Sequence, residues 1–401
     1  MTYRPPAVPD GVRDDPDRQA AYLLADGFTE TPAGGLAARL RARGRLRVKF
    51  GVDPTASDVT WGWSVPLRRL RRFQELGHTA VLVVGDFTAQ VGDPSGKSAT
   101  RRRLTADEVR AHTEACMAAL LEILSPDRLE VRRNSEWLGS MGMSDVLELA
   151  SQATVAQLLE RSDFSNRFAA RTPISLIEFL YPLLQGHDSV VTQADVELGG
   201  TDQLFNFMLG RGLQQRAGQD PQSCVCAPLL VGTDGTRKMS QSYGNYIGVA
   251  EPADEIFGKV MSIPDSAMEL YVHLALDDAP EEKAALLAEL NGVGLKRELA
   301  RRMVAMHHGS AVAAEDAFDR KFVRHEPPAD MPEHETVEAY LPKILIELGW
   351  ASSLSEARRA IRGRGVRIDG QTVADENRTV ATGTYTVQFG RRRYARVTRG
   401  A

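Results

Sequence analysis

The sequence predicts a mixed α/β fold built on a parallel sheet, and three neighbouring segments carry that prediction. Arg47–Val52 (RVKFGV) is a short buried-type strand, Ser64–Leu76 has apolar residues at helical spacing, and Thr79–Val84 (TAVLVV) is a β-branched run of strand length. Strand, helix and strand in this order form a βαβ unit, whose two strands lie parallel with a right-handed crossover. Ligands of such sheets bind at the carboxyl ends of the strands.

The remaining elements are predicted from local patterns, in chain order. Helical spacing predicts helices over 105–125, 143–170, Ile174–Leu184, Ala284–Leu290 and Leu295–Met306, then over Val337–Gly349 and Ser355–Arg362. Further strands are expected at Val190–Val196, Pro228–Val231, Val366–Ile368 and Tyr385–Phe389.

This order of elements divides the chain of 401 residues into several parts. We expect an N-terminal extension over 1–35, an α/β domain over 36–247 with a helical insertion near 120–190, an α-helical domain over 248–325, an acidic and proline-rich linker over 326–335, and a small α+β domain over 336–401.

Composition excludes several classes of protein. Hydrophobic residues make up 43% and charged residues 25%, which excludes long disorder and fibrous repeats. No apolar run approaches the roughly 20 residues of a membrane span, and the N-terminus lacks a secretory apolar region, so we expect a cytoplasmic protein. The three cysteines, Cys116, Cys224 and Cys226, are expected to be small buried residues.

Charge is unevenly distributed along the chain. The whole sequence has a formal net charge of −4, but residues 336–401 contain 12 Arg and Lys against 6 Asp and Glu, a net charge of +6, so the other residues carry −10. A small basic domain on an acidic body predicts a local contact with a polyanion, most often RNA or DNA. A solvated arginine-rich surface is the alternative.

Three glycine-rich segments have the composition of ligand-binding turns. Val91–Lys97 (VGDPSGK) combines a carboxylate with an ammonium group, but it is no P-loop, because that motif requires glycine where position 91 has Val. Gly235–Ser242 (GTRKMSQS) offers backbone N–H groups, Lys238 and hydroxyls to a polyphosphate. Gly199–Gln203 (GGTDQ) allows close backbone approach beside an Asp–Gln pair.

Together these segments resemble the tyrosyl-tRNA synthetase family of class I aminoacyl-tRNA synthetases, from about Gly35 to Arg399. The matching segments are Gly51-Val-Asp-Pro-Thr55, the segment ending at Lys97, Leu180-Tyr-Pro-Leu-Leu-Gln185 with Asp188, Gly199-Gly-Thr-Asp-Gln203, and Lys238-Met-Ser-Gln-Ser242, which is similar to a KMSKS motif. The C-terminal segments Ala351–Arg359 and Gly365–Gly370 resemble an S4 RNA-binding domain, which agrees with the local positive charge.

The resemblance implies a Rossmann-like catalytic domain with a pocket for tyrosine or a close analogue. In that pocket Tyr181, Gln185 and Gln203 hold the α-ammonium group with Asp93 close by, and Asp188 receives the phenol hydroxyl. A buried carboxylate left without its hydroxyl partner disfavours a substrate that lacks the hydroxyl.

The resemblance also implies ATP with Mg²⁺ as substrates, no permanently bound cofactor or protein metal site, tRNA as a partner and a homodimer formed through the catalytic domain. The expected ATP-binding residues are Gly51, Asp53, Gly62, Gly200, Asp202, Val231 and Met239. The residues expected to act in catalysis are Thr55, Thr60, Trp63, Lys97, Lys238 and Gln241. The expected RNA-binding residues are Arg358, Arg359, Arg362 and Arg364.

Two motifs depart from the family pattern. The His-x-Gly-His motif reads Thr60-Trp61-Gly62-Trp63, and Gln241 replaces the second lysine of KMSKS. Loss of a group that stabilises charge only in the transition state costs roughly 2–4 kcal/mol. The indoles of Trp61 and Trp63 are also expected to fill part of the nucleotide site.

Three functions follow from this mixture of retained and altered motifs. The first is a divergent paralogue that still binds tyrosine or an analogue but has repurposed amino-acid chemistry in specialised metabolism. The alternatives are a functional tyrosine–tRNA ligase of protein biosynthesis and a non-catalytic protein that binds an amino acid or RNA.

Overall fold

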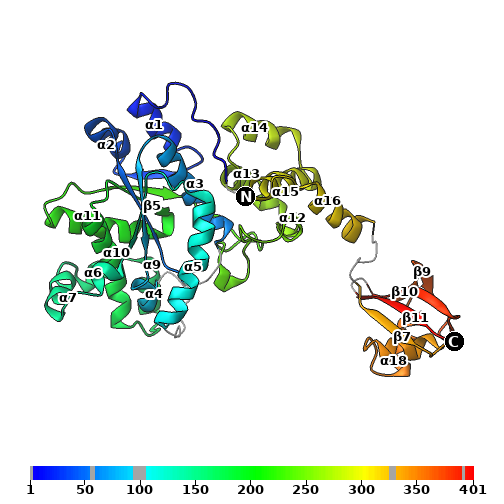
Figure 1. Cartoon of the computed structure of the whole chain (residues 1–401). Coiled ribbons are helices and arrows are strands. Elements are labelled where there is room, and N and C mark those ends of the chain that lie inside the picture. The colour runs from blue at the N-terminus through cyan, green and yellow to red at the C-terminus, as the bar shows by residue number, and fades with distance from the viewer. Residues whose placement is uncertain (1–2, 55–58, 94–104, 325–330, 391–392) are drawn as a thin grey trace. The chain divides into compact units, whose positions relative to one another are not determined.

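The computed structural model describes residues 3–54, 59–93, 105–324, 331–390 and 393–401. The chain forms two compact units, Met1–Val312 and Ala313–Ala401. Figure 1 shows that the first unit contains a sheet with helices on both faces, followed by a group of helices, and that the second contains a smaller sheet.

A six-stranded sheet forms the centre of the first unit, in the order β1-β6-β5-β2-β3-β4. The strands are β1 (Thr29–Thr31), β2 (Arg47–Val52), β3 (Thr79–Val84), β4 (Leu129–Arg133), β5 (Val196–Gly200) and β6 (Ser223–Ala227). Only β1 is antiparallel to its neighbour. The predicted βαβ unit is confirmed, because β2 and β3 are parallel and their continuous apolar runs are typical of strands covered on both faces.

Helices cover both faces of this sheet. In Figure 1, α3 (Trp61–Glu75) and α5 (Ala106–Ile123) lie on one face, and α10 (Leu176–Thr192) and α11 (Leu204–Arg216) lie on the other. The other helices of this part are α1 (Pro16–Leu23), α2 (Gly35–Arg43), α4 (Thr88–Val91), α6 (Ser135–Leu138), α7 (Met143–Ala150), α8 (Val155–Leu158), α9 (Ser162–Ala169) and the short 3₁₀ helices η1 (Thr201–Gln203) and η2 (Gln241–Tyr243).

Several predicted elements need correction. The strand expected at Val190–Val196 is wrong, because α10 continues to Thr192 and β5 begins only at Val196. The strand expected at Pro228–Val231 is also wrong, since the buried strand is the preceding β6.

Two predicted boundaries of the α/β domain differ from the structure. The insertion expected near 120–190 starts after β4, because that strand pairs with β3 in the main sheet. The predicted N-terminal extension over 1–35 contributes β1 to the same sheet.

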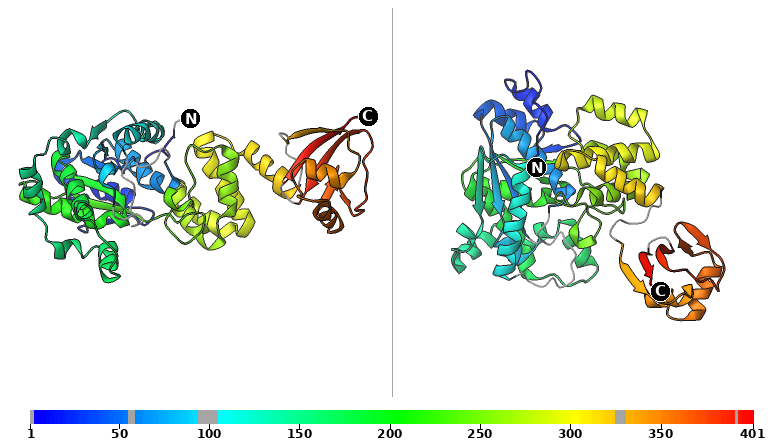
Figure 2. Two further views of the ribbon diagram at one scale, coloured as in Figure 1. Left: turned by 90° about the horizontal axis from the view of Figure 1, so that it is seen from below. Right: turned by 45° about the vertical axis from the view of Figure 1, so that its right-hand side comes forward.

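A bundle of helices completes the first unit and confirms the helical character predicted after Pro252 (Figures 1 and 2). It contains α12 (Ala253–Ser262), η3 (Asp265–Ala267), α13 (Met268–Ala275), α14 (Pro280–Glu289) and α15 (Gly292–His308), followed by α16 (Val312–Phe318) at the unit boundary. Ile256, Phe257 and Val260 of α12 are fully buried in its core.

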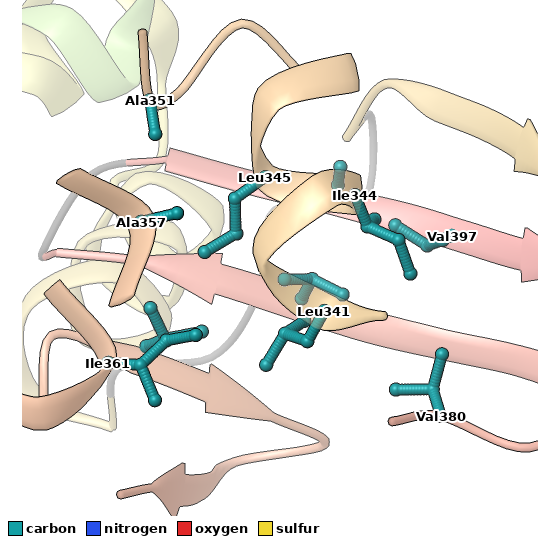
Figure 3. Packing of buried hydrophobic residues seen from close by; sticks show 11 residues of the cluster. Leu341, Ile344, Leu345, Ala351, Ala357, Ile361, Val380 and Val397 are labelled. Atoms are coloured by element: carbon teal, nitrogen blue, oxygen red, sulfur yellow. The ribbon is translucent and has the colours of Figure 1, made fainter. Parts of the chain in front are cut away.

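The second unit contains most of α16, then the π-helical turn η4 (Asp319–Val323), and a five-stranded sheet in the order β7-β11-β10-β8-β9. Its elements are β7 (Glu333–Thr336), α17 (Leu341–Glu347), α18 (Leu354–Arg362), β8 (Val366–Ile368), β9 (Gln371–Val373), β10 (Gly383–Phe389) and β11 (Arg393–Arg399). Figure 3 shows Leu341 and Ile344 of α17 and Ile361 of α18 packed in its core with Val397. The predicted linker over 326–335 is corrected at its end, because β7 pairs in parallel with β11.

Candidate functional site

A cavity of about 290 Å³ opens at the carboxyl ends of the central strands. Its lining includes Asp53 after β2, Gly85 after β3, Gly200 at the end of β5 and Pro228 after β6. The chain leaves β2 toward β3 and β4 on one side, while β5 and β6 lie on the other. This change of direction is where open α/β sheets bind ligands.

Most of the predicted site residues meet in this cavity. They are Gly51, Asp53, Thr60, Gly62, Trp63, Asp93, Tyr181, Gln185, Asp188, Gly200, Asp202, Gln203, Lys238, Met239 and Gln241. Thr55 and Lys97 lie outside the described residues. Val231 is not among the residues that line the cavity: its carbonyl oxygen accepts a hydrogen bond of 2.7 Å from the Tyr271 hydroxyl, and its backbone forms a bridge to Lys238.

Asp188 is a buried carboxylate of α10 that is held by two donors. Trp137 Nε1 donates to Asp188 Oδ1 at 2.9 Å, and Asn134 Nδ2 donates to Asp188 Oδ2 at 3.3 Å. Burial raises the pKa of Asp188 to about 6, although the nearby Lys49 ammonium and both donors favour the ionised form. At neutral pH the group is therefore an anionic acceptor in a fixed orientation.

Asp53 is a second buried carboxylate of the cavity lining. It accepts hydrogen bonds from the Tyr181 hydroxyl at 2.8 Å and from Thr88 Oγ1 at 2.7 Å. Burial raises the pKa of Asp53 to about 7, and burial beside carboxylates raises the pKa of Tyr181 well above its usual value, so this phenol keeps its proton. The lack of a side chain at Gly85 leaves room for the Asp53 carboxylate, because a Cβ at position 85 would lie 2.0 Å from Asp53 Oδ1.

A second polar cluster surrounds Asp93. Gln203 Nε2 donates to Asp93 Oδ2 at 3.1 Å, and Arg161 Nη2 donates to Asp93 Oδ1 at 3.1 Å. Asn206 Nδ2 donates to Gln185 Oε1 at 2.8 Å and to Gln203 Oε1 at 3.0 Å. Gln203 and Asp93, both predicted to lie at the ammonium group, are thus bonded directly, and Gln185 is linked to Gln203 through Asn206.

The predicted nucleotide residues gather at the start of α3. The Gly62 backbone nitrogen lies 3.2 Å from Met239 Sδ, so the glycine of the altered motif faces the Lys238–Ser242 loop. Lys238 Nζ pairs with Asp202 Oδ2 at 2.8 Å; burial opposes its charge, but this carboxylate outweighs burial and raises the pKa of Lys238. The loop therefore presents an ionised ammonium group at the cavity wall.

The two tryptophans of the altered motif have different environments. Trp63 is half-buried and lines the cavity. Trp61 is fully buried and does not line it; its indole packs edge to face on His307 of α15, with ring centroids 5.2 Å apart. The expectation that both indoles fill the nucleotide site is therefore wrong for Trp61, because successive positions of a helix point in different directions.

The four arginines predicted to bind RNA lie together in the second unit. Arg358, Arg359 and Arg362 belong to α18, and Arg364 follows it; all four are exposed. Arg358 donates from Nε to the Tyr340 hydroxyl at 2.8 Å, and Arg362 pairs with Glu376 at 2.7 Å.

Several residues that support the cavity lining were missed in the sequence. Thr88, Asn134, Trp137, Arg161 and Asn206 all hold predicted site residues in place. Asn134 directly follows β4, so the rule that ligands lie at carboxyl ends of strands gave a signal for it. No local pattern distinguished Arg161 from other helix-end arginines.

The described residues also bear on metal binding, thiol chemistry and membrane insertion. Within those ranges, no three His, Cys, Asp or Glu side chains are arranged to hold a metal ion. Cys116, Cys224 and Cys226 are buried, as predicted. None of the helices described has both the length and the apolar character that crossing a bilayer requires.

Comparisons with known families agree with this arrangement. Residues 41–320 match the model of the class I tRNA synthetases for W and Y, and residues 341–384 match the S4 domain. Tyrosine–tRNA ligase of Geobacter metallireducens is 48% identical over 364 residues, covering 88% of this chain and 90% of the relative. The tyrosine–tRNA ligase of Thermotoga maritima is 45% identical over 372 residues, covering 90% of this chain and 92% of the relative.

Solved structures show the same fold. The tyrosyl-tRNA synthetase of Archaeoglobus fulgidus, crystallised with L-tyrosine, superposes with a TM-score of 0.62 at 22% identity, covering 76% of this chain and 99% of that one. The enzyme from Aeropyrum pernix gives 0.60 at 19% identity, covering 76% and 97%. The chain therefore belongs to the tyrosyl-tRNA synthetase family, with a class I catalytic domain and a C-terminal S4 domain.

Proposed function

We propose that the chain is a tyrosine–tRNA ligase, which activates tyrosine with ATP and transfers the tyrosyl group to tRNA. The observation that carries the proposal is the preformed cavity, in which the buried Asp188 carboxylate and the Asp93 cluster are both held by side-chain donors. The curated relatives favour this activity over the repurposed chemistry that the altered motifs suggested.

In this proposal the amino acid is recognised at both ends. The phenol hydroxyl of tyrosine donates to Asp188, and the α-ammonium group donates to Asp93, Gln185 and Gln203, with the Tyr181 oxygen close by. A substrate without the hydroxyl would leave the buried Asp188 carboxylate with one acceptor unpaired, which disfavours phenylalanine.

The chemistry needs charge stabilisation more than proton transfer. A carboxylate oxygen of tyrosine attacks the α-phosphorus of ATP, the bond from that phosphorus to the bridging oxygen breaks, and pyrophosphate leaves. Lys238 would leave Asp202 and stabilise the charge developing on the leaving group. Mg²⁺ belongs to the substrate here, bound to the phosphate oxygens of ATP. A ribose hydroxyl of tRNA then attacks the tyrosyl carbonyl and releases AMP.

The altered motif keeps part of its polar character in this proposal. The Thr60 hydroxyl accepts from the Trp63 backbone nitrogen at 3.3 Å and caps α3, which leaves its proton available to a phosphate oxygen. Trp63 supplies a single indole N–H at the cavity wall. These neutral groups replace two imidazoles, so we expect activation to be slow rather than absent.

The S4 domain supports tRNA as the acceptor. Its exposed arginines at Arg358, Arg359, Arg362 and Arg364 form a basic surface suited to phosphate contacts. Binding of tRNA should weaken steeply with salt, and replacing Arg359 and Arg364 with Ala should reduce that salt dependence.

A homodimer is also part of the proposal. The helical insertion exposes large apolar side chains, with exposed fractions of 63% for Leu147, 66% for Phe168 and 82% for Leu176. Where exposed apolar groups form one contiguous patch, they mark a contact surface. Sedimentation equilibrium of the native chain and of the Leu147→Glu, Phe168→Glu double variant measures the dimer and its loss.

Tyrosine-dependent ATP–pyrophosphate exchange tests the central claim, followed by transfer of labelled tyrosine to tRNA. Exchange and transfer together would establish the ligase. Tyrosine binding without exchange would instead favour the repurposed enzyme, and binding of neither tyrosine nor ATP would reject the site.

A further inference from the structure

Four side chains beside the amino-acid cavity form a closed ring of hydrogen bonds. Arg161 donates from Nη2 to Asp93 Oδ1 at 3.1 Å and from Nη1 to Asn206 Oδ1 at 3.0 Å. Asn206 donates to Gln203 Oε1 at 3.0 Å, and Gln203 Nε2 donates to Asp93 Oδ2 at 3.1 Å, which closes the ring. A branch from Asn206 reaches Gln185 Oε1 at 2.8 Å.

The Arg161 guanidinium group and the Asp93 carboxylate together set the direction of every bond in this ring. Arginine can only donate, so the Asn206 amide must turn its oxygen toward Arg161 and its nitrogen toward the two glutamines. Each glutamine then presents its carbonyl oxygen to Asn206, and that oxygen keeps a second lone pair. The Asp93 carboxylate can only accept, so it fixes the Gln203 amide from the other side of the ring. Without Arg161 the Asn206 oxygen loses its donor, and the ring is held from the Asp93 side alone.

Arg161 and Asn206 are themselves held in place. Arg161 is 5% exposed, and Asn206 is 1% exposed. Arg161 Nε pairs with Asp163 Oδ1 at 2.9 Å, and its guanidinium carbon lies 5.6 Å from the centre of the Phe164 ring. Since both Asp163 and Phe164 belong to α9, the first turn of that helix fixes the arginine against the cavity wall.

We propose that Arg161 and Asn206 are positioning residues, which orient the acceptors of Asp93, Gln185 and Gln203 toward one primary ammonium group. An ammonium group has only donors and needs convergent acceptors. If the Gln185 and Gln203 amides were flipped, their N–H groups would face the cation and repel it. The inference rests on the proposed function, because it assigns the ammonium group to a bound amino acid.

The test compares two ligands that differ only in the ammonium group. Tyrosine and 3-(4-hydroxyphenyl)propionate, which lacks that group, are titrated calorimetrically into the full-length native protein and into Asn206→Asp and Arg161→Met. Asn206→Asp keeps the acceptor that faces Arg161 and removes both N–H donors. Arg167→Met is the matched control, because Arg167 is a buried arginine of α9 that pairs with Glu178 and does not line the cavity.

We expect the preference for tyrosine over the propionate to fall about 10- to 100-fold in both variants and to stay unchanged in the control. Arg161→Lys, which is also a donor only, should recover part of the preference. The ratio of the two ligand affinities is measured within one protein, so a variant that is only partly folded still gives this ratio. Variants at two different sites keep the test valid if one of them does not fold.

Equal weakening of both ligands would overturn the inference, since a merely structural role predicts it. An unchanged preference in Asn206→Asp would also overturn it while leaving the proposed function intact. If the native protein itself shows no preference for tyrosine, the proposed function fails, and the inference fails with it.

Discussion

The indole of Trp61 meets the imidazole of His307 edge to face, with ring centroids 5.2 Å apart and planes at 83°. This contact joins the first residue of α3, beside the cavity, to α15 of the helical bundle. Burial lowers the pKa of His307 to about 4, so the ring is neutral at physiological pH and packs as an aromatic group. Trp61 of the altered motif therefore forms a structural contact between α3 and the helical bundle.

This contact predicts opposite roles for the two tryptophans. Trp61→Ala should lower the free energy of unfolding by about 3–5 kcal/mol, because it removes a fully buried ring and leaves a cavity. Trp63→Ala should cost much less stability, since Trp63 is half-buried, but it should change ATP affinity. Urea unfolding and ATP titration of both variants measure this difference, and similar losses of stability in the two would contradict the assignment.

Asp188 should determine the preference for tyrosine over phenylalanine. Asp188→Ala removes the anionic acceptor of the phenol hydroxyl, so tyrosine should bind roughly 10- to 150-fold more weakly while phenylalanine changes little. Calorimetric titration of both amino acids gives the two affinities. If tyrosine binds to the variant as tightly as to the native protein, Asp188 does not receive the hydroxyl.

Tyrosine affinity should also depend on pH through Asp188. Burial raises the pKa of this carboxyl to about 6, so the protonated form dominates below that pH and has lost the anionic acceptor. If tyrosine binds only the ionised form, its dissociation constant should rise about tenfold between pH 7.5 and pH 5.

Phenylalanine is the control for this pH dependence. Burial raises the pKa of Asp53 to about 7, so Asp53 titrates in the same range, but it is bonded to Tyr181 and affects both amino acids. The ratio of the two affinities isolates Asp188. A ratio that does not change with pH would show that Asp188 does not titrate in this window.

The local sequence pattern predicted those strands whose own apolar or alternating residues indicate burial. β2, β3 and β8 have the predicted bounds, because their apolar or alternating runs end at turn residues. β5 was missed partly because it contains Glu197, which looks like a surface residue in sequence. In the structure Glu197 is buried and pairs with the buried Lys49 at 2.9 Å, a partner that lies on β2 and is set by the tertiary fold.

The sequence predicted those residues of the site that belong to motifs shared with the family. That resemblance brought Asp93, Tyr181 and Gln203 to the same cavity as Asp188. It gave no role to Arg161, because the bond from Arg161 to Asp93 joins positions 68 residues apart that become neighbours only when α9 packs beside the cavity. Supporting contacts of this kind form only when the chain is folded, so no local sequence pattern predicts them.

Restoring the family motif should accelerate activation. The triple variant Thr60→His, Trp63→His, Gln241→Lys reintroduces two imidazoles and an ammonium group where pyrophosphate leaves, so tyrosine-dependent pyrophosphate exchange should rise about 10- to 100-fold. Thr60→His also removes the cap of α3 and should cost about 1 kcal/mol of stability.

Trp63→His with Gln241→Lys is the matched double variant, because it keeps the Thr60 cap and separates catalytic gain from loss of stability. Exchange rates at saturating ATP and tyrosine, measured beside the unfolding midpoint of each variant, make the comparison. Trp61 stays unchanged throughout, since its ring packs on His307 of α15. No gain in either variant would show that the altered motif does not limit the rate, and that the surrounding cavity has adapted to threonine and tryptophan.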